Sequence, residues 1–210
     1  KLEKFELYGD FVLLEKVEEN RFKQSALTYL IETVQKLQLT TPSTDESSNS
    51  IETTEKSFSL NSFRLSVKYI CWVVINSSND NGKGPCYFVS LCDNNENGND
   101  GYYGKGSIHL EGETKQETRC MSYFTRYLPQ KYCKYNIPEL DRIGIYSFGV
   151  APFDHQPSGT CNFSRLKDAD ITLKFANNIR KLIQNKPIHF YAVNYNIYNI
   201  NGGISGLKYS

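Results

Sequence analysis

From residue 58 onward the chain has short apolar runs, some with alternating apolar and polar residues, that turn-forming residues separate. Between residues 63 and 69 every second side chain is apolar, which is the period of a strand with one buried face. We expect strands in the apolar runs 63–75, 86–91, 107–110, 143–150, 171–175 and 188–200. Since no helical pattern lies between these runs, the chain is predicted to be all-β, an antiparallel sandwich or barrel.

The N-terminal part has a different pattern. Between Phe22 and Leu37, apolar residues recur at spacings of three and four, which predicts an amphipathic helix from about Glu15 to Gln38. Residues 40–57 are rich in Ser, Thr, Asn and Glu and are predicted to form a loop or a disordered insertion. The apolar segment 5–14, before the helix, is predicted to be a strand.

Length and charge limit the classes of protein that this chain can be. Its 210 residues suit one domain, or one domain with a fragment of another. The 24 basic and 23 acidic residues give a net charge of +1, without the basic excess of a nucleic-acid-binding domain. The longest apolar run, residues 69–75, is far shorter than the roughly 20 residues that span a bilayer. We therefore predict neither nucleic-acid binding nor direct membrane insertion. Because the chain begins at Lys1, we also expect the whole polypeptide to be longer.

The six cysteines form no C-x-x-C pair, which argues against a zinc ribbon or a thioredoxin-like site. In a chain with its own apolar core, scattered cysteines are more often reduced core residues than disulfides. The even number leaves disulfides open as an alternative in a secreted protein.

No set of residues in the sequence has the spacing of an active site. The histidines His109, His155 and His189 lie in separate runs, and His155 is expected to be a hydrogen-bonded loop residue rather than a base. Ser158 lacks the Gly-x-Ser-x-Gly pattern of a nucleophile elbow, and the glycine-rich residues 101–106 lack P-loop spacing.

Two pairs of alternate carboxylates, Asp168 with Asp170 and Glu111 with Glu113, would suit a calcium site or a glycosidase pair. Solvated strand ends are the favoured interpretation of both pairs. We therefore expect no catalytic residue, no metal site and no cofactor.

The most informative stretch is residues 155–165, with the sequence His-Gln-Pro-Ser-Gly-Thr-Cys-Asn-Phe-Ser-Arg. Proline second and glycine fourth in residues 156–159 predict a type I turn that leads into a strand. Asn76 and Asn162 both match the N-glycosylation pattern. Asn76 is the candidate site, because it follows an apolar strand, whereas Phe163 is expected to pack inward and to disfavour modification of Asn162.

Several segments resemble, in the same order, the major capsid proteins of nucleocytoplasmic large DNA viruses. The most specific is residues 156–165, here called the signature segment. The others are residues 18–25, 29–32 with Gln35, 67–68, 72–74, 123–124, 145–148 and 191–196, followed by Gly203, Gly206, Leu207 and Ser210. Three places depart from the family pattern: Leu65-Ser66 replace His-Pro, residues 150–154 replace a Leu, Pro and acidic run, and residues 40–57 resemble an insertion.

The resemblance implies an antiparallel jelly-roll β-sandwich with one N-terminal linking helix, taken from a double jelly roll. Residues 1–14 would be the last strand of a preceding jelly roll, residues 15–57 the linking helix and polar loop, and residues 58–210 the C-terminal jelly roll. It also implies that the signature residues are structural, with Arg165 a candidate for an ion pair. These residues are Gln156, Pro157, Ser158, Gly159, Asn162, Phe163, Ser164 and Arg165.

The implied function is that of a structural protein, not an enzyme, that forms pseudo-hexagonal trimeric capsomers of an icosahedral shell. Its implied partners are two further copies in a homotrimer, neighbouring capsomers, and minor capsid and penton proteins. Its implied place is the virion, after assembly in the host cytoplasm. A jelly-roll carbohydrate-binding module is the alternative function, because surface Tyr and Asn suit sugar stacking and hydrogen bonding.

Overall fold

The structure of the protein is a computed structural model that describes residues 6–41, 55–76, 87–89, 91, 104–133, 142–175, 183 and 185–209. The chain divides into two compact units, residues 1–31 with 196–210 and residues 32–195. In chain order the elements are α1 (Lys16–Gln24), β1 (Leu27–Thr40), β2 (Glu55–Ser59), β3 (Ser66–Asn76), β4 (Tyr87–Phe88), β5 (Lys105–Leu110), β6 (Glu113–Cys120), η2 (Tyr123–Tyr127), α2 (Leu128–Tyr132), β7 (Gly144–Ser147), β8 (Cys161–Asn162), η3 (Phe163–Arg165), β9 (Ala169–Lys174), β10 (Pro187–Asn201) and β11 (Ile204–Leu207).

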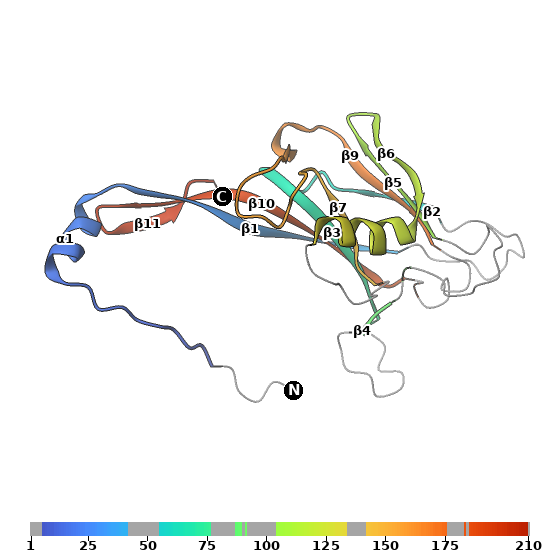
Figure 1. The fold of residues 1–210 in the computed structure, drawn as a ribbon. Helices are drawn as coiled ribbons and strands as arrows, with labels where there is room; N and C mark the ends of the chain where they lie inside the picture. The colour runs from blue at the N-terminus through green and yellow to red at the C-terminus, as the bar shows by residue number, and fades with distance from the viewer. Residues whose placement is uncertain are drawn as a thin grey trace, which may run out of the picture. The chain divides into compact units, whose positions relative to one another are not determined.

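The strands form two sheets (Figure 1). The first has the order β1-β10-β3-β4, with β11 paired to β10 and with β7 and β8 paired to β3. The second has the order β2-β9-β5-β6. The pairs β3–β10, β3–β7, β2–β9, β5–β9 and β5–β6 are all antiparallel. Because most neighbours are distant in sequence, the connections cross between the two sheets, as in Greek-key sandwiches.

The core lies between the two sheets. Ile70, Trp72 and Val74 of β3 and the alternate residues Ile171 and Leu173 of β9 are fully buried. The ring of Phe58 in β2 lies 5.5 Å from that of Phe190 in β10, which joins the sheets directly. Burial of this kind contributes about 25 cal/mol per Å² of apolar surface and is the main force that holds the layers together. The predicted all-β sandwich is confirmed.

The long N-terminal helix was predicted wrongly beyond Gln24. The helix α1 ends there, Ser25 has extended backbone angles, and residues 27–40 form the strand β1. Alternate residues of β1 from Ile31 to Leu39 are partly covered, and Leu37 and Leu39 pack against the core. The apolar residues of this segment recur at helical spacings of three and four, yet it forms a strand. Its β-branched residues and its tyrosine favour the extended backbone.

Other elements also differ from expectation. Strand β2 begins at Glu55, inside the predicted loop 40–57, and residues 42–54 of that loop lie outside the described residues. Strand β6 has the polar sequence ETKQETRC and was not predicted, and neither was the helical segment formed by η2 and α2. Residues 6–15 form neither helix nor strand, so the strand expected over residues 5–14 is not formed in this structure. No helix in the described part of the chain is long and apolar enough to cross a membrane.

Candidate functional site

The signature segment lies against the first half of β3. The preceding strand β7 pairs with β3 from Tyr69 to Trp72, and β8 pairs with Ser66 and Val67. The loop between β7 and β8 therefore begins and ends beside β3. The signature segment lies next to the N-terminal end of that strand. Its geometry shows what each side chain does there.

The turn expected at residues 156–159 is formed earlier in the chain. The backbone N–H of Asp154 donates to the carbonyl oxygen of Ala151 at 3.3 Å, and residues 157–160 contain no turn or bend. The side chain of Ser158 instead closes the wider loop 151–158, because its Oγ accepts from the N–H of Ala151 at 2.9 Å. A serine side chain thus orders the segment in which proline and glycine were predicted to form a turn.

Gly159 is required by a close approach of two backbone segments. It has φ of 140°, and a Cβ at this position would lie 3.0 Å from the carbonyl oxygen of Phe148. A Cβ on Gly149 would lie 2.8 Å from the carbonyl oxygen of Gly159. The two glycines face each other, so neither position has room for a side chain.

The sequence Asn162-Phe163-Ser164 holds the start of β3. Leu65, just before the strand, has a left-handed backbone with φ of 67°, which is unfavourable for a residue with a side chain. The Ser164 Oγ accepts from the N–H of Leu65 at 2.8 Å, and the N–H of Phe163 donates to the Leu65 carbonyl at 2.9 Å. Asn162 Oδ1 accepts from the N–H of Ser164 at 3.1 Å and fixes the turn that presents both groups.

Phe163 anchors the segment in the core, as its predicted inward packing required. Its side chain is buried, and its ring lies 5.6 Å from that of Phe148 and 6.2 Å from that of Phe63, both in edge-to-face geometry. Aromatic pairs in this arrangement contribute about 0.5–1.5 kcal/mol each beyond their burial. Phe163 thus links the loop after β7 to the residues before β3.

The remaining signature residues are exposed. Gln156, Pro157 and Arg165 are exposed, as is the neighbouring His155. Within the described parts of the chain Arg165 forms no ion pair, so the partner expected for it is not found there. Asn76 is the last residue of β3, as expected, and the two serines that follow it lie outside the described residues.

The other residues considered for chemistry have structural contacts. Asp170 accepts a hydrogen bond from Ser57 Oγ at 2.6 Å and lies 3.5 Å from His109 Nδ1. Glu111 accepts from the backbone N–H groups of Lys167 and of Asp168, the latter at 3.2 Å. Among the described residues, no three of His, Cys, Asp or Glu are grouped so that they could hold a metal ion.

Partial burial favours the protonated form of three of the described thiols. It raises the pKa of Cys71 to about 11 and also raises the pKa values of Cys133 and Cys161. These three residues and Cys120 are free thiols. Reactive cysteines need a lowered pKa, so these three partly buried thiols have the character of structural residues rather than nucleophiles.

A partly buried polar network joins β1, β10 and Arg64, which lies just before β3, and it was not predicted. The side-chain amide of Gln35 donates to the Arg64 carbonyl at 2.6 Å and accepts from the Arg64 N–H at 2.9 Å. It thus forms the two backbone hydrogen bonds that a residue of a paired strand would form. The fully buried Asn194 accepts from Gln35 at 2.9 Å and donates to Thr33 Oγ1 at 2.9 Å. The network specifies the register of β1, because a shift by one residue would leave these groups unpaired.

Lys68 of β3 is a buried charge with separate partners, Glu32 on β1 and Tyr195 on β10. Its side chain is 2% exposed and forms an ion pair with Glu32, and its Nζ lies 4.9 Å above the ring centre of Tyr195. An ammonium at this depth is tolerated only with such partners. One sequence signal could have indicated the network: the polar residues at alternate, inward positions of β1.

Removal of the Ser164 hydroxyl tests the hold on Leu65. We expect Ser164→Ala to lower the free energy of unfolding by about 1 kcal/mol, because the Leu65 N–H loses its partner while its backbone stays strained. Chemical denaturation of both proteins would measure the change. Ser158→Thr, which keeps a hydroxyl at the other end of the segment, is the control. An unchanged stability for Ser164→Ala would show that the bond does not hold Leu65.

Comparison with solved structures defines the class of this sandwich. The chain is similar to the quasi-atomic PBCV-1 virus capsid structure with a TM-score of 0.69 and 25% sequence identity, over 94% of this chain and 55% of that one. The Faustovirus major capsid protein has the same fold, with a TM-score of 0.56 at 12% identity. The sandwich is therefore a viral jelly roll, as the resemblance implied.

Comparison of sequences gives the family. The family described as large eukaryotic DNA virus major capsid protein matches residues 18–206. The major capsid protein of Phaeocystis pouchetii virus is 38% identical over 103 residues, 49% of this chain and 19% of that protein. The major capsid protein of Paramecium bursaria Chlorella virus 1 is 29% identical over 97% of this chain and 53% of that protein. The chain belongs to the family of major capsid proteins of large eukaryotic DNA viruses and is a structural component of the virion. It spans about half the length, or less, of the curated relatives that it matches.

Proposed function

We propose that this chain is the C-terminal jelly roll, with its linking segment, of a double jelly-roll protein that assembles into homotrimeric, pseudo-hexagonal capsomers. The observation that carries the proposal is the match to the PBCV-1 capsid over nearly the whole of this chain but only 55% of that one. The remaining length of such a protein is sufficient for a second sandwich. Two sandwiches in each of three subunits give six lobes, so a threefold particle can tile a shell with hexagonal order.

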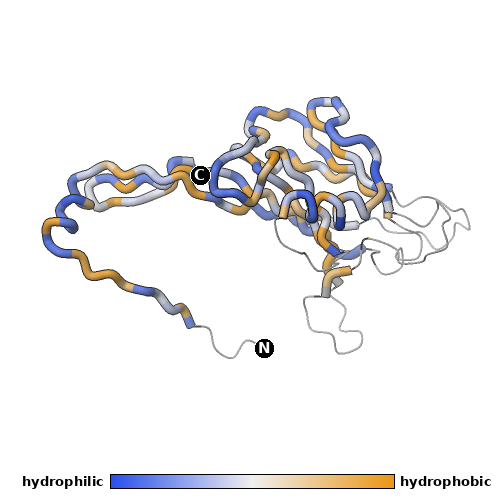
Figure 2. The backbone as a smooth tube through the Cα atoms, viewed as in Figure 1, coloured by the Kyte–Doolittle hydropathy of each residue, from blue (hydrophilic) through white to orange (hydrophobic). Residues whose placement is uncertain are grey.

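The apolar surface near the N-terminus supports the proposal that another domain packs against this part of the chain. Leu7, Phe11, Val12 and Leu13 are each at least 80% exposed, and Figure 2 shows the hydrophobic stretch that precedes α1. A contiguous apolar patch is rare on the surface of a soluble monomer and usually marks an interface. In the proposed protein this segment is the last strand of the preceding jelly roll, and α1 with the following residues connects the two sandwiches.

The signature segment has a structural role in this proposal. The residues from Ser158 to Ser164 stabilise the loop between β7 and β8 and the entry to β3, while the exposed Gln156, Pro157 and Arg165 face neighbouring subunits. No step of the proposed function is catalytic. The other proposed partners are adjacent capsomers and minor capsid and penton proteins, with assembly in the host cytoplasm. Asn76 is proposed to carry a glycan.

Native mass is the direct test of this proposal. We expect the full-length protein to have three times its chain mass by light scattering at low concentration, because obligate interfaces bury on the order of 2,000–5,000 Å² and do not dissociate easily. Dilution over two orders of magnitude is the control for weak association. A stable monomer of the full-length chain would contradict the trimer.

A further inference from the structure

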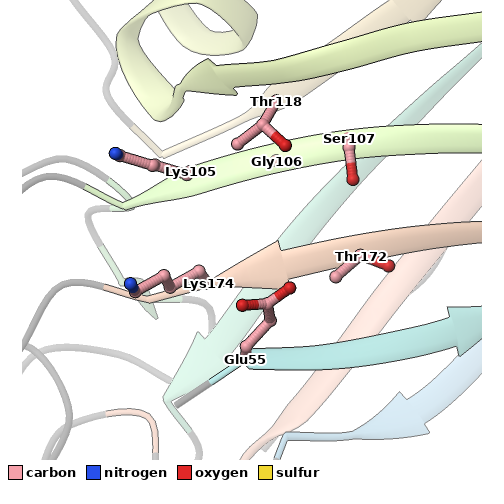
Figure 3. A pocket seen from close by; sticks show the side chains of 7 residues that line it. All are labelled: Glu55, Lys105, Gly106, Ser107, Thr118, Thr172 and Lys174. Carbon is pink, nitrogen blue, oxygen red and sulfur yellow. The ribbon is translucent and has the colours of Figure 1, made fainter. Parts of the chain in front are cut away.

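The outward face of the second sheet contains a polar hollow that the capsid function does not explain. It has a volume of about 160 Å³ and is lined by Glu55, Lys105, Gly106, Ser107, Thr118, Thr172 and Lys174 (Figure 3). These residues come from the neighbouring strands β2, β9, β5 and β6. The hollow lies within one compact unit, residues 32–195.

Two lysines lie side by side at the edge of this hollow. Lys105 of β5 and Lys174 of β9 are direct cross-strand partners in the antiparallel register. Like charges in directly opposed positions destabilise a sheet. In Figure 3 the two side chains extend in the same direction, toward the same end of the strands. Among the described residues neither lysine forms an ion pair, whereas Lys23, Lys68 and Lys115 do.

A buried hydroxyl opens into the same hollow. Ser107 is 7% exposed, and no hydrogen bond to its hydroxyl is formed within the described regions of the chain. Its cross-strand partner Thr172 contributes a second hydroxyl, and Thr118 of β6 a third. Thr172 Oγ1 already donates to Asp170 Oδ1 at 3.5 Å. The hydroxyls of Ser107 and Thr118 and the ammonium groups of the two paired lysines are the remaining donors, and such donors together can bind an oxyanion.

Among the described residues that line the hollow, Glu55 is the one whose charge opposes an anion. It is the cross-strand partner of Lys174 on the side away from Lys105. Its carboxylate lies beyond 4.0 Å from both ammonium groups, because no ion pair joins them, and Figure 3 shows it apart from the lysine ends. Glu55 therefore weakens binding of an anion without neutralising either lysine.

We propose that this hollow binds a phosphate or sulfate group, held by Lys105, Lys174 and the hydroxyl of Ser107. The site differs from a P-loop, which the glycine-rich residues 101–106 were predicted not to form, because side chains of a sheet face hold the anion instead of backbone N–H groups. The ligand relieves the repulsion between the two lysines. The inference does not depend on the trimer.

Calorimetric titration of the full-length assembled protein tests the site. Inorganic phosphate and inorganic sulfate represent the free ion, glucose 6-phosphate and glucose 6-sulfate represent the esters, and chloride keeps the ionic strength constant. We expect millimolar binding that Lys105→Gln and Lys174→Gln each weaken about fivefold, since each removes one charge-assisted contact. Tighter binding of the sugar esters would assign the site to a modified glycan, and equal binding would assign it to the free ion.

Two further variants separate a binding site from a purely structural one. Glu55→Gln is expected to tighten phosphate binding about twofold, because it removes the opposing charge, and Lys115→Gln on β6 is expected to leave binding unchanged. Without ligand, Lys105→Gln is expected to melt at or above the wild-type temperature, which also shows that the variant folds. Absence of phosphate and sulfate binding by the wild-type protein, or equal binding by wild type and both lysine variants, would overturn the proposal.

Discussion

Gly144→Ala is expected to lower the free energy of unfolding by about 3 kcal/mol or to prevent folding altogether. Gly144 of β7 is the cross-strand partner of Trp72 in β3, and the fully buried indole ring lies over the glycine. A Cβ at this position would overlap the ring atoms Cε2, Cζ2 and Nε1. Overpacking of a core usually costs about 1–3 kcal/mol, and a large ring enclosed by Phe124 and Phe190 has little freedom to move. Urea denaturation of the purified protein would measure the loss.

Gly206→Ala is the matched control for this change. A Cβ on Gly206 would meet no atom within 4 Å. The free energy of unfolding of the Gly206→Ala protein is therefore expected to differ from that of wild type by less than about 0.5 kcal/mol. The double variant Gly144→Ala with Trp72→Phe is expected to lose less unfolding free energy than the two single variants lose in total. The smaller ring leaves room for the methyl group. A Gly144→Ala protein as stable as wild type would show that the indole does not occupy the place described.

Phe163→Ala is the second large effect, with an expected loss of about 3–4 kcal/mol. The substitution removes a buried ring from between Phe148 and Phe63 and leaves a cavity where the signature segment meets the core. Because the same residue holds Leu65 through its backbone, the start of β3 is expected to lose protection from hydrogen exchange as well. Denaturation and hydrogen exchange would measure the two effects.

Phe153→Ala controls for the loss of an aromatic ring in the same region. Phe153 is 45% exposed and contacts only the ring of Tyr69 at 5.2 Å among the described aromatic residues, so a loss below about 1 kcal/mol is expected. Equal losses for the two variants would mean that the signature segment is not anchored by Phe163.

The strands that could be predicted from the sequence are those with one apolar and one polar face. Strands β3 and β10 have apolar residues at alternate inward positions, so a period of two identifies them. Strand β1 was predicted as a helix because the inward residues Thr33 and Gln35 are polar. Their partner Asn194 lies about 160 positions along the chain, and no local pattern contains that pairing. Strand β6 is polar on both faces, and pairing with β5 holds it.

The signature segment was recognisable from sequence, but its mechanism was not. Its resemblance to the family and the inward position of Phe163 could be inferred from residue types. The turn was misplaced because Ser158 closes the loop through its side chain, which the pattern of proline and glycine does not show. The left-handed backbone of Leu65 was also invisible, since it depends on contacts with residues almost 100 positions away.

An electron cryo-microscopy map of the purified full-length protein would test the central claim most directly. The account predicts a threefold particle with two jelly rolls in each subunit, in which the second is the sandwich described above and the apolar residues 7–14 are covered. A particle with a single sandwich in each subunit, or with residues 7–14 still exposed to solvent, would contradict it.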